Sequence, residues 1–169
     1  MTIHDLERLA GRPLTESELQ RLTANVAARG ELWEPHIDAT ADTRTYVSLH
    51  RDASVDVWAI FWLPGNDTGW HDHDTSSGAV HVVNGTLVEH NLRIAGDDLR
   101  TEHEGGGGFT FGPSHIHRVT CETDSAVSIH AYSPPLWRLG QYAVDPDGAL
   151  TRQSVSYADE LRPLEPVAA

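Results

Sequence analysis

Two His-x-His patterns are the features of this chain best suited to chemistry. His71 and His73 form one, and His115 and His117 form the other. Alternate residues of a β-strand point to the same side, so His71 and His73 can aim two imidazoles at one metal ion from a stiff backbone. With 11 histidines in 169 residues, chance alone produces about 0.7 such patterns. The spacing therefore needs support from its surroundings.

Short β-type runs must position these histidines. The periodicity changes to two from Thr43 onward, and the run over 55–63 is apolar on both sides for much of its length. Five further runs follow, at 79–83, 86–92, 109–111, 115–121 and 125–132. Asn84-Gly85 between two of them is a strong hairpin signal. Many short strands with regular turns favour an all-β sandwich or barrel.

A helical lead-in is predicted ahead of the strands. Thr15 with Glu18 three residues later has the capping-box pattern, and Gly30 is a natural C-terminal stop. The apolar stripe between them has helical spacing and consists of Leu19, Leu22 and Val26. An earlier helical stretch with Leu6 and Leu9 is expected to end at Pro13.

Length and composition indicate one domain in three parts. We expect a helical segment over 1–40, a barrel over 41–145 and a tail over 146–169 packed on the barrel surface. The chain has 39% hydrophobic and 22% charged residues, which excludes a mainly disordered protein. No apolar run is long enough to cross a bilayer. The net charge of −13 argues against nucleic acid and anionic membranes as partners.

The single cysteine, Cys121, excludes an internal disulfide and makes the cytosol the default compartment. We therefore expect a cytoplasmic protein, as a monomer or small homo-oligomer, and expect Cys121 itself to be a small buried residue. The acidic N-terminus lacks a signal pattern.

The surroundings of the histidine patterns resemble the two signature motifs of the cupin superfamily, whose members are small antiparallel jelly-roll barrels. Gly65 stands five residues before His71, and Gly85 follows the first pattern. Gly107 stands five residues before Pro113, which precedes the second. The resemblance covers residues 58–135 and implies an all-β cupin barrel with a metal ion inside it.

The metal ligands that this resemblance implies are His71, His73 and His117. Many cupins add a Glu four or five residues after the second His, where this chain has Ser77 and Gly78. The expected ligand set is therefore three neutral imidazoles, which leave about three positions open on an octahedral ion.

The run after His117 resembles the thiol dioxygenase family, to which cysteine dioxygenase belongs. Ser128, His130 and Tyr132 match its Ser-x-His-x-Tyr run and share one strand face. The resemblance implies that Fe(II) binds a small thiol and O2 and that a sulfinate is formed. Tyr132 is expected to hydrogen-bond near the bound oxygen or the substrate, with His130 and Ser128 behind it. A buried hydrogen-bonded ladder is the alternative for these three residues.

The substrate side departs from the family pattern. Tyr46-Val47-Ser48 places Ser48 where the family's cysteine enzymes have a carboxylate-binding Arg and the mercaptopropionate-type enzymes have Gln. Serine cannot form the bidentate ion pair of arginine. Either Arg51 or Arg44 supplies the charge from another register, or the substrate is a larger thiol such as ergothioneine.

The residues expected at the substrate are Ser48, Arg51, Trp70 and His81. The side chains of Trp58, Trp62, Trp70 and Trp137 can either face a quaternary ammonium group or pack in the core. For His81, a position inside the barrel and one on its outer face both stay open. The position that carries a cross-linking Cys in mammalian-type cysteine dioxygenases is Gly78, so no cross-link is expected.

The remaining histidines are expected to be structural, except His115, which is placed at the rim of the site or behind its ligands. The structural set consists of His4, His36, His50, His90 and His103. A second class of function also stays open. It is a metal-binding cupin that binds a small molecule without oxidising it, or an isomerase with another divalent metal.

Overall fold

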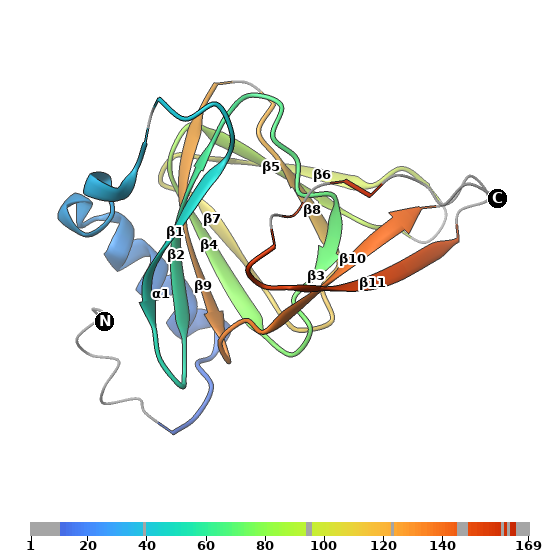
Figure 1. Cartoon of the computed structure of the whole chain (residues 1–169), viewed down its shortest axis with the longest axis horizontal. Coiled ribbons are helices and arrows are strands. Elements are labelled where there is room, and N and C mark those ends of the chain that lie inside the picture. The colour runs from blue at the N-terminus through green and yellow to red at the C-terminus, as the bar shows by residue number, and fades with distance from the viewer. Residues whose placement is uncertain are drawn as a thin grey trace.

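Two antiparallel sheets face each other in the computed structural model (Figure 1), which describes residues 11–38, 40–93, 96–122, 124–144, 149–159, 161 and 163–164. The five-stranded sheet has the order β1 (Thr45–Arg51), β2 (Asp56–Trp62), β9 (Ala126–Ser133), β4 (Ser77–Asn84) and β7 (Gly108–Phe111). The six-stranded sheet has the order β11 (Leu150–Ser156), β10 (Arg138–Val144), β3 (Trp70–Asp72), β8 (His117–Thr120), β5 (Thr86–Asn91) and β6 (Leu99–Glu104). The expected all-β architecture is confirmed.

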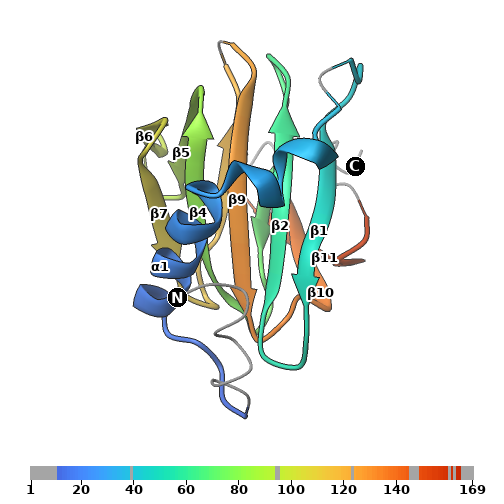
Figure 2. The same ribbon diagram turned by 90° about the vertical axis from the view of Figure 1, so that its left-hand side faces the viewer.

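Helix α1 (Glu16–Ala27) covers the outer face of the five-stranded sheet (Figure 2). Thr15 is its N-cap and forms the predicted capping box with Glu18. The predicted stripe of Leu19, Leu22 and Val26 is fully buried against the sheet. The expected stop at Gly30 is wrong, because α1 ends at Ala27 and Gly30 begins a short 3-10 turn, η2 (Gly30–Leu32), followed by η3 (Glu34–His36). The stretch with Leu6 and Leu9 lies outside the described residues.

Strand β9 is buried at every position because both of its faces are covered. Its odd-numbered residues pack in a cluster with α1, and these are Val127, Ile129 and Ala131. Its even-numbered residues Ser128, His130 and Tyr132 point the other way, into the space between the sheets. The alternation of strand residues thus directs three polar side chains into the barrel.

Three strands were not expected from the sequence: β6, β10 and β11. Strand β11 lies in the region expected to be a surface tail, and it pairs with β10 from Leu150 to Ser156. Most side chains of β6 and β11 are exposed. Backbone pairing at a sheet edge needs no apolar alternation, so the sequence pattern misses such strands. The three-part division of the chain stays a prediction.

Apolar side chains from both sheets fill one end of the barrel interior. This cluster includes Trp62, Val80, Val82, Leu87, Phe109, Phe111, Val119 and Leu139. None of the described helices is long and apolar enough to span a bilayer. The other end of the interior holds the cavity described next.

Candidate metal centre

Three histidines meet between β3 and β8. His71 lies in β3, His73 directly follows its last residue, and His117 opens β8 as the pairing partner of His71. The ring centroids lie 4.9 Å apart for His71 and His73, 4.7 Å for His71 and His117, and 5.2 Å for His73 and His117. One ligand atom of each lies within 4.8 Å of the other two, and no carboxylate belongs to this group among the described residues. The three imidazoles can hold one metal ion.

All three imidazoles are buried, with exposures of 3% or less. Burial lowers the pKa of His71 and His73 well below the ordinary histidine range, and the neighbouring histidines lower it further. Burial also lowers the pKa of His117, although Glu89 opposes this shift. Neutral imidazoles keep the lone pair that a metal ion requires.

The hydrogen bonds of the rings fit a metal ion. His71 Nδ1 lies 3.0 Å from the Gly69 carbonyl and His117 Nδ1 lies 2.9 Å from Glu89 Oε1. Both neighbours are acceptors, so Nδ1 carries the proton and Nε2 presents its lone pair. His73 Nδ1 is buried with no hydrogen-bond partner within the described part of the chain. Such an orphaned polar atom is rare except where a ligand is bound.

Glu89 of β5 stands behind the third imidazole and was not anticipated from the sequence. Its carboxylate contacts His117 at 2.9 Å, His115 at 3.0 Å and His103 at 3.4 Å. Burial on its own raises the pKa of this carboxyl, but the three imidazoles hold the pKa of Glu89 well below its usual range. The carboxylate therefore orients His117. It also places His115 behind the ligands and gives His103 a polar partner.

Strand β3 is held in place by the strands that the sequence pattern missed. Asp72 accepts hydrogen bonds from the backbone N–H of Gly140 at 3.0 Å and from Tyr142 at 2.5 Å. It also pairs with Arg152 of β11 at 2.8 Å. Because Asp72 separates His71 from His73, these contacts fix the backbone that carries both imidazoles.

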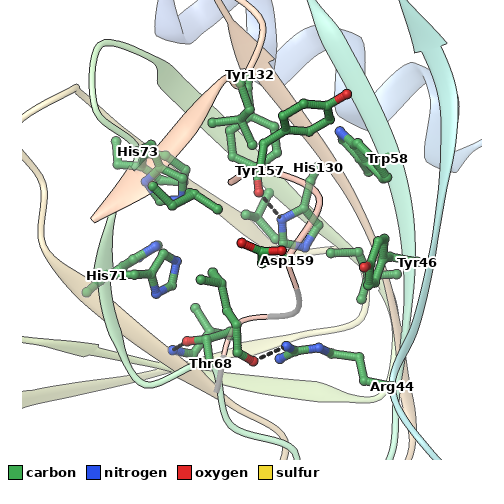
Figure 3. A pocket seen from close by; sticks show the side chains of 18 of the residues that line it. Arg44, Tyr46, Trp58, Thr68, His71, His73, His130, Tyr132, Tyr157 and Asp159 are labelled. Atoms are coloured by element: carbon green, nitrogen blue, oxygen red, sulfur yellow. Dashed lines mark hydrogen bonds between the residues drawn. The ribbon is translucent and has the colours of Figure 1, made fainter. Parts of the chain in front are cut away.

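A second polar chain leads into the same cavity. Tyr132 Oη lies 3.0 Å from His130 Nδ1, and His130 Nε2 lies 2.8 Å from Ser128 Oγ (Figure 3). Ser128 in turn accepts a hydrogen bond from Trp62 Nε1 at 2.8 Å. Burial lowers the pKa of His130 to about 3 and raises the pKa of Tyr132 above its usual range. Both groups are therefore electrically neutral at pH 7.

The cavity has a volume of about 710 Å³ including its open mouth. The histidines His71, His73 and His117 line it together with His130 and Tyr132. Most of its remaining wall is apolar or aromatic, including Ile60, Trp62, Val80, Phe111, Leu136 and Leu139. Cavities of this size and character hold small organic molecules.

Two residues expected at the substrate, Ser48 and Arg51, do not line this cavity. Ser48 is exposed on β1. Arg51 is occupied by a salt bridge to Asp56 and a 2.6 Å hydrogen bond to the Leu136 carbonyl. Arg44, the other arginine considered, does line the cavity, where it donates to the Leu161 carbonyl.

The other two residues expected at the substrate, Trp70 and His81, also lie away from the cavity. Trp70 precedes His71 on β3, so strand alternation directs it to the opposite face. His81 follows Val80, which lines the cavity, and shares its strand face with Ala79, which packs in the cluster with α1. Of the two positions open for His81, the structure selects the outer face.

Gly78 lies opposite Tyr132 in the pairing of β4 with β9. A Cβ atom at Gly78 would meet Phe111 Cζ at 2.2 Å. The Phe111 ring fills this space and stacks on His73 with centroids 4.3 Å apart. Cys121 is buried elsewhere, donates to the Asp124 carbonyl at 3.0 Å, and has its pKa raised by burial. Among the described residues no thiol lines the cavity.

Several lining residues were missed by the sequence reading: Tyr157, Asp159 and Leu161 from the C-terminal segment. Nothing in their local pattern relates them to the histidines, because only the pairing of β11 with β10 brings them there. Glu89 did carry a signal, since it is an acidic residue inside the otherwise apolar run Leu87-Val88-Glu89.

Comparison with known proteins identifies the fold and the family. A sequence model of the family described as cysteine dioxygenase type I matches residues 2–144. The structure is similar to a cupin superfamily protein from Desulfitobacterium hafniense DCB-2, with 11% identity and a TM-score of 0.51, over 60% of this chain and 87% of that one. It is also similar to a protein with a double-stranded β-helix domain from Klebsiella pneumoniae, with 12% identity and a TM-score of 0.52, over 70% and 91%. These structural likenesses confirm the cupin fold.

Proposed function

Because this chain belongs to the cysteine dioxygenase type I family, we propose that it is a non-haem Fe(II) thiol dioxygenase. The reaction is RS⁻ + O2 → RSO2⁻, in which sulfur loses four electrons and both oxygen atoms end on it. No external reductant is needed. The observation that carries the proposal is that the three imidazoles and the Tyr132 hydroxyl line the same cavity.

His71, His73 and His117 are the proposed ligands. Bound there, Fe(II) would supply the redox chemistry that joins the thiol with O2 and that side chains lack. The three neutral imidazoles leave the positive charge of the ion uncompensated. This ligand set favours an anionic sulfur, so the thiol is expected to bind as thiolate.

Tyr132 is the proposed proton donor, and the direction of its hydrogen-bonded chain follows from Trp62. The indole N–H can only donate, so Ser128 accepts there and donates its own hydrogen to His130 Nε2. Neutral His130 then donates Nδ1–H to the Tyr132 oxygen. The Tyr132 hydrogen is left to point into the cavity, towards the substrate or the reacting oxygen. Ser128 and His130 act as positioning residues.

The cavity wall provides the remaining functions. Its apolar side chains exclude bulk water, which strengthens electrostatic interactions inside. Arg44 lies over the Trp62 ring at 5.0 Å and lines the cavity. It supports binding of a substrate carboxylate, the role first considered for Ser48 and Arg51.

The size of the cavity supports a second candidate within this reaction class, a thiol larger than cysteine such as ergothioneine. A volume of about 710 Å³ including the mouth exceeds what a three-carbon thiol fills. Cytoplasmic location and a monomeric or small homo-oligomeric state stay predictions.

A thiol panel tests the proposal. The protein is loaded with Fe(II) without oxygen and mixed with cysteine, mercaptopropionate, cysteamine or ergothioneine before air is admitted. We expect one equivalent of sulfinate per O2 consumed with at least one thiol, measured by an oxygen electrode and mass spectrometry. Oxygen uptake with none of them would favour the non-oxidative metal-binding cupin. The metal-free protein is the control.

A further inference from the structure

An aromatic cluster on the solvent side of the cavity has no role in the chemistry proposed above. It consists of Tyr46 of β1, Trp58 of β2 and Tyr157, which follows β11. The rings of Tyr46 and Trp58 have centroids 5.7 Å apart, and those of Trp58 and Tyr157 lie 6.5 Å apart. Tyr46 is 40% exposed, which places this cluster towards the solvent. Figure 3 shows Tyr46 and Trp58 across the view from His71 and His73.

The relative orientation of the rings produces a concave aromatic wall. Tyr46 is tilted by 59° to Trp58, and Tyr157 is tilted by 64° to it. Rings inclined in this way do not cover one another's faces as stacked rings do. The face of an aromatic ring carries partial negative charge and attracts cations.

A carboxylate completes the negative character of this wall. Asp159 follows Tyr157 by two residues, is exposed and lines the same cavity. The backbone N–H of Ser156 donates to Asp159 Oδ2 at 3.0 Å, and Tyr46 donates to the Ala158 carbonyl at 3.1 Å. These bonds tie the segment that carries Tyr157 and Asp159 to strand β1.

The nearby arginines are placed so that they do not fill this cluster. Arg51 lies over the Tyr157 ring at 4.3 Å, and its charge is balanced by the salt bridge to Asp56. This contact shows that the ring already attracts one cation of the chain itself. Arg44 packs on Trp62 instead, at 5.0 Å.

We propose that Tyr46, Trp58, Tyr157 and Asp159 form a binding site for a cationic group, so that the substrate is a thiol carrying an ammonium or quaternary ammonium group. The identity of the ligand as a thiol rests on the proposed function, but recognition of the cation does not. A carboxylate on the same molecule is compatible with Arg44, which makes a zwitterionic thiol the best match to the cavity.

Two thiols of equal shape test the charge requirement. (2-Mercaptoethyl)trimethylammonium and 3,3-dimethylbutane-1-thiol differ only in the replacement of N⁺ by carbon. We expect the KM of the cationic thiol to be about tenfold lower, as estimated from cation–π and ion-pair energies in a partly desolvated site. Longer mercaptoalkyl homologues of both compounds locate the best spacing from sulfur to charge. Equal KM values for every matched pair would overturn the proposal.

Single variants assign the effect to the cluster. Asp159→Asn and Trp58→Leu are each expected to reduce the KM ratio of the matched pair at least about threefold. Asp42→Asn removes an exposed carboxylate that does not line the cavity, and Trp137→Leu removes an indole that is 71% exposed and does not line it either. These two controls are expected to keep the ratio. A ratio unchanged in Asp159→Asn and Trp58→Leu as well would contradict the assignment.

Binding without turnover separates this proposal from the reaction. Choline and its neutral isostere 3,3-dimethylbutan-1-ol are titrated into the metal-free protein while tryptophan fluorescence is recorded. Saturable binding of choline that is weaker in Asp159→Asn supports the cation site, even if no thiol is oxidised and the proposed function fails. Thiol oxidation without charge preference, together with no choline binding, would reject the cation site alone.

Discussion

Glu89 links one proposed metal ligand to two further histidines. Its carboxylate accepts from His117 Nδ1 and contacts His115 and His103. A carboxylate behind a ligating imidazole fixes the ring and raises its basicity. Buried and surrounded by imidazoles, Glu89 orients a site in which it is not itself a ligand.

Glu89→Gln is therefore expected to weaken Fe(II) binding about 10- to 100-fold, the usual effect of removing such a carboxylate. The amide keeps the shape of the side chain but holds the His117 N–H less strongly. Metal content after dialysis against graded chelator concentrations measures the affinity. Glu104→Gln, at an exposed position on the neighbouring strand β6, is the control. Equal affinity in both variants would mean that Glu89 does not support the centre.

The Tyr132 hydroxyl is expected to act on turnover and not on metal binding. Tyr132→Phe keeps the ring that stacks near His73, with centroids 5.3 Å apart, and removes only the donor. We predict normal iron content and a kcat reduced about 10²-fold, the low end of the contribution of a positioned proton donor. His73→Ala is the comparison, with iron lost and the β-sheet circular dichroism signal kept. An unchanged kcat would remove Tyr132 from the mechanism.

At the scale of elements, the site depends on how β4, β7 and β9 pack. Gly78 of β4 leaves room for the Phe111 ring of β7, and that ring stacks on His73. Strand β9 supplies the hydroxyl opposite Gly78. Three strands thus set the position of one imidazole through a contact that no single strand contains.

Gly78→Ala tests this packing. A methyl group there would overlap Phe111 Cζ, so the ring must move away from its place on His73. We expect the free energy of unfolding to fall by about 1–3 kcal/mol, as for other overpacked cores, and iron binding to weaken. Denaturant unfolding and metal content report the two effects. In Gly112→Ala, the control, the new methyl meets its nearest neighbour, Glu16, at an ordinary 3.5 Å. A fully stable, iron-replete Gly78→Ala protein would contradict this role of Phe111.

The charge of the whole molecule bears on substrate capture. The chain carries a net charge of −13, and a field of this sign concentrates cations near the surface. Such long-range attraction is screened by salt, with a Debye length of about 30 Å at 0.01 M and about 8 Å at 0.15 M ionic strength.

If the substrate is cationic, kcat/KM for (2-mercaptoethyl)trimethylammonium is expected to fall severalfold between low and physiological ionic strength. The neutral isostere is not attracted by the field, so its kcat/KM is expected to stay constant. Initial rates measured in graded NaCl test this expectation. A parallel response of the two thiols would show that the net charge has no part in capture.

The sequence by itself determined the features that depend on neighbours along the chain. These include the capping box of α1, the β-type runs, and the strand face shared by Ser128, His130 and Tyr132. The motif spacings also indicated the cupin barrel and the three histidines that the structure brings together. Period-two alternation operates within one strand, so it can be read without knowing what the strand packs against.

Only the tertiary structure decided what stands around those histidines. It placed Glu89 behind His117, Arg44 in the cavity wall, and Tyr157 with Asp159 on its solvent side. It also moved Ser48, Arg51, Trp70 and His81 away from the cavity. These positions depend on which strands pair and in which register, and strand pairing joins segments that are far apart in the sequence. Backbone hydrogen bonds at a sheet edge leave almost no trace in side-chain pattern, so the residues that edge strands deliver to a site are known only from the fold.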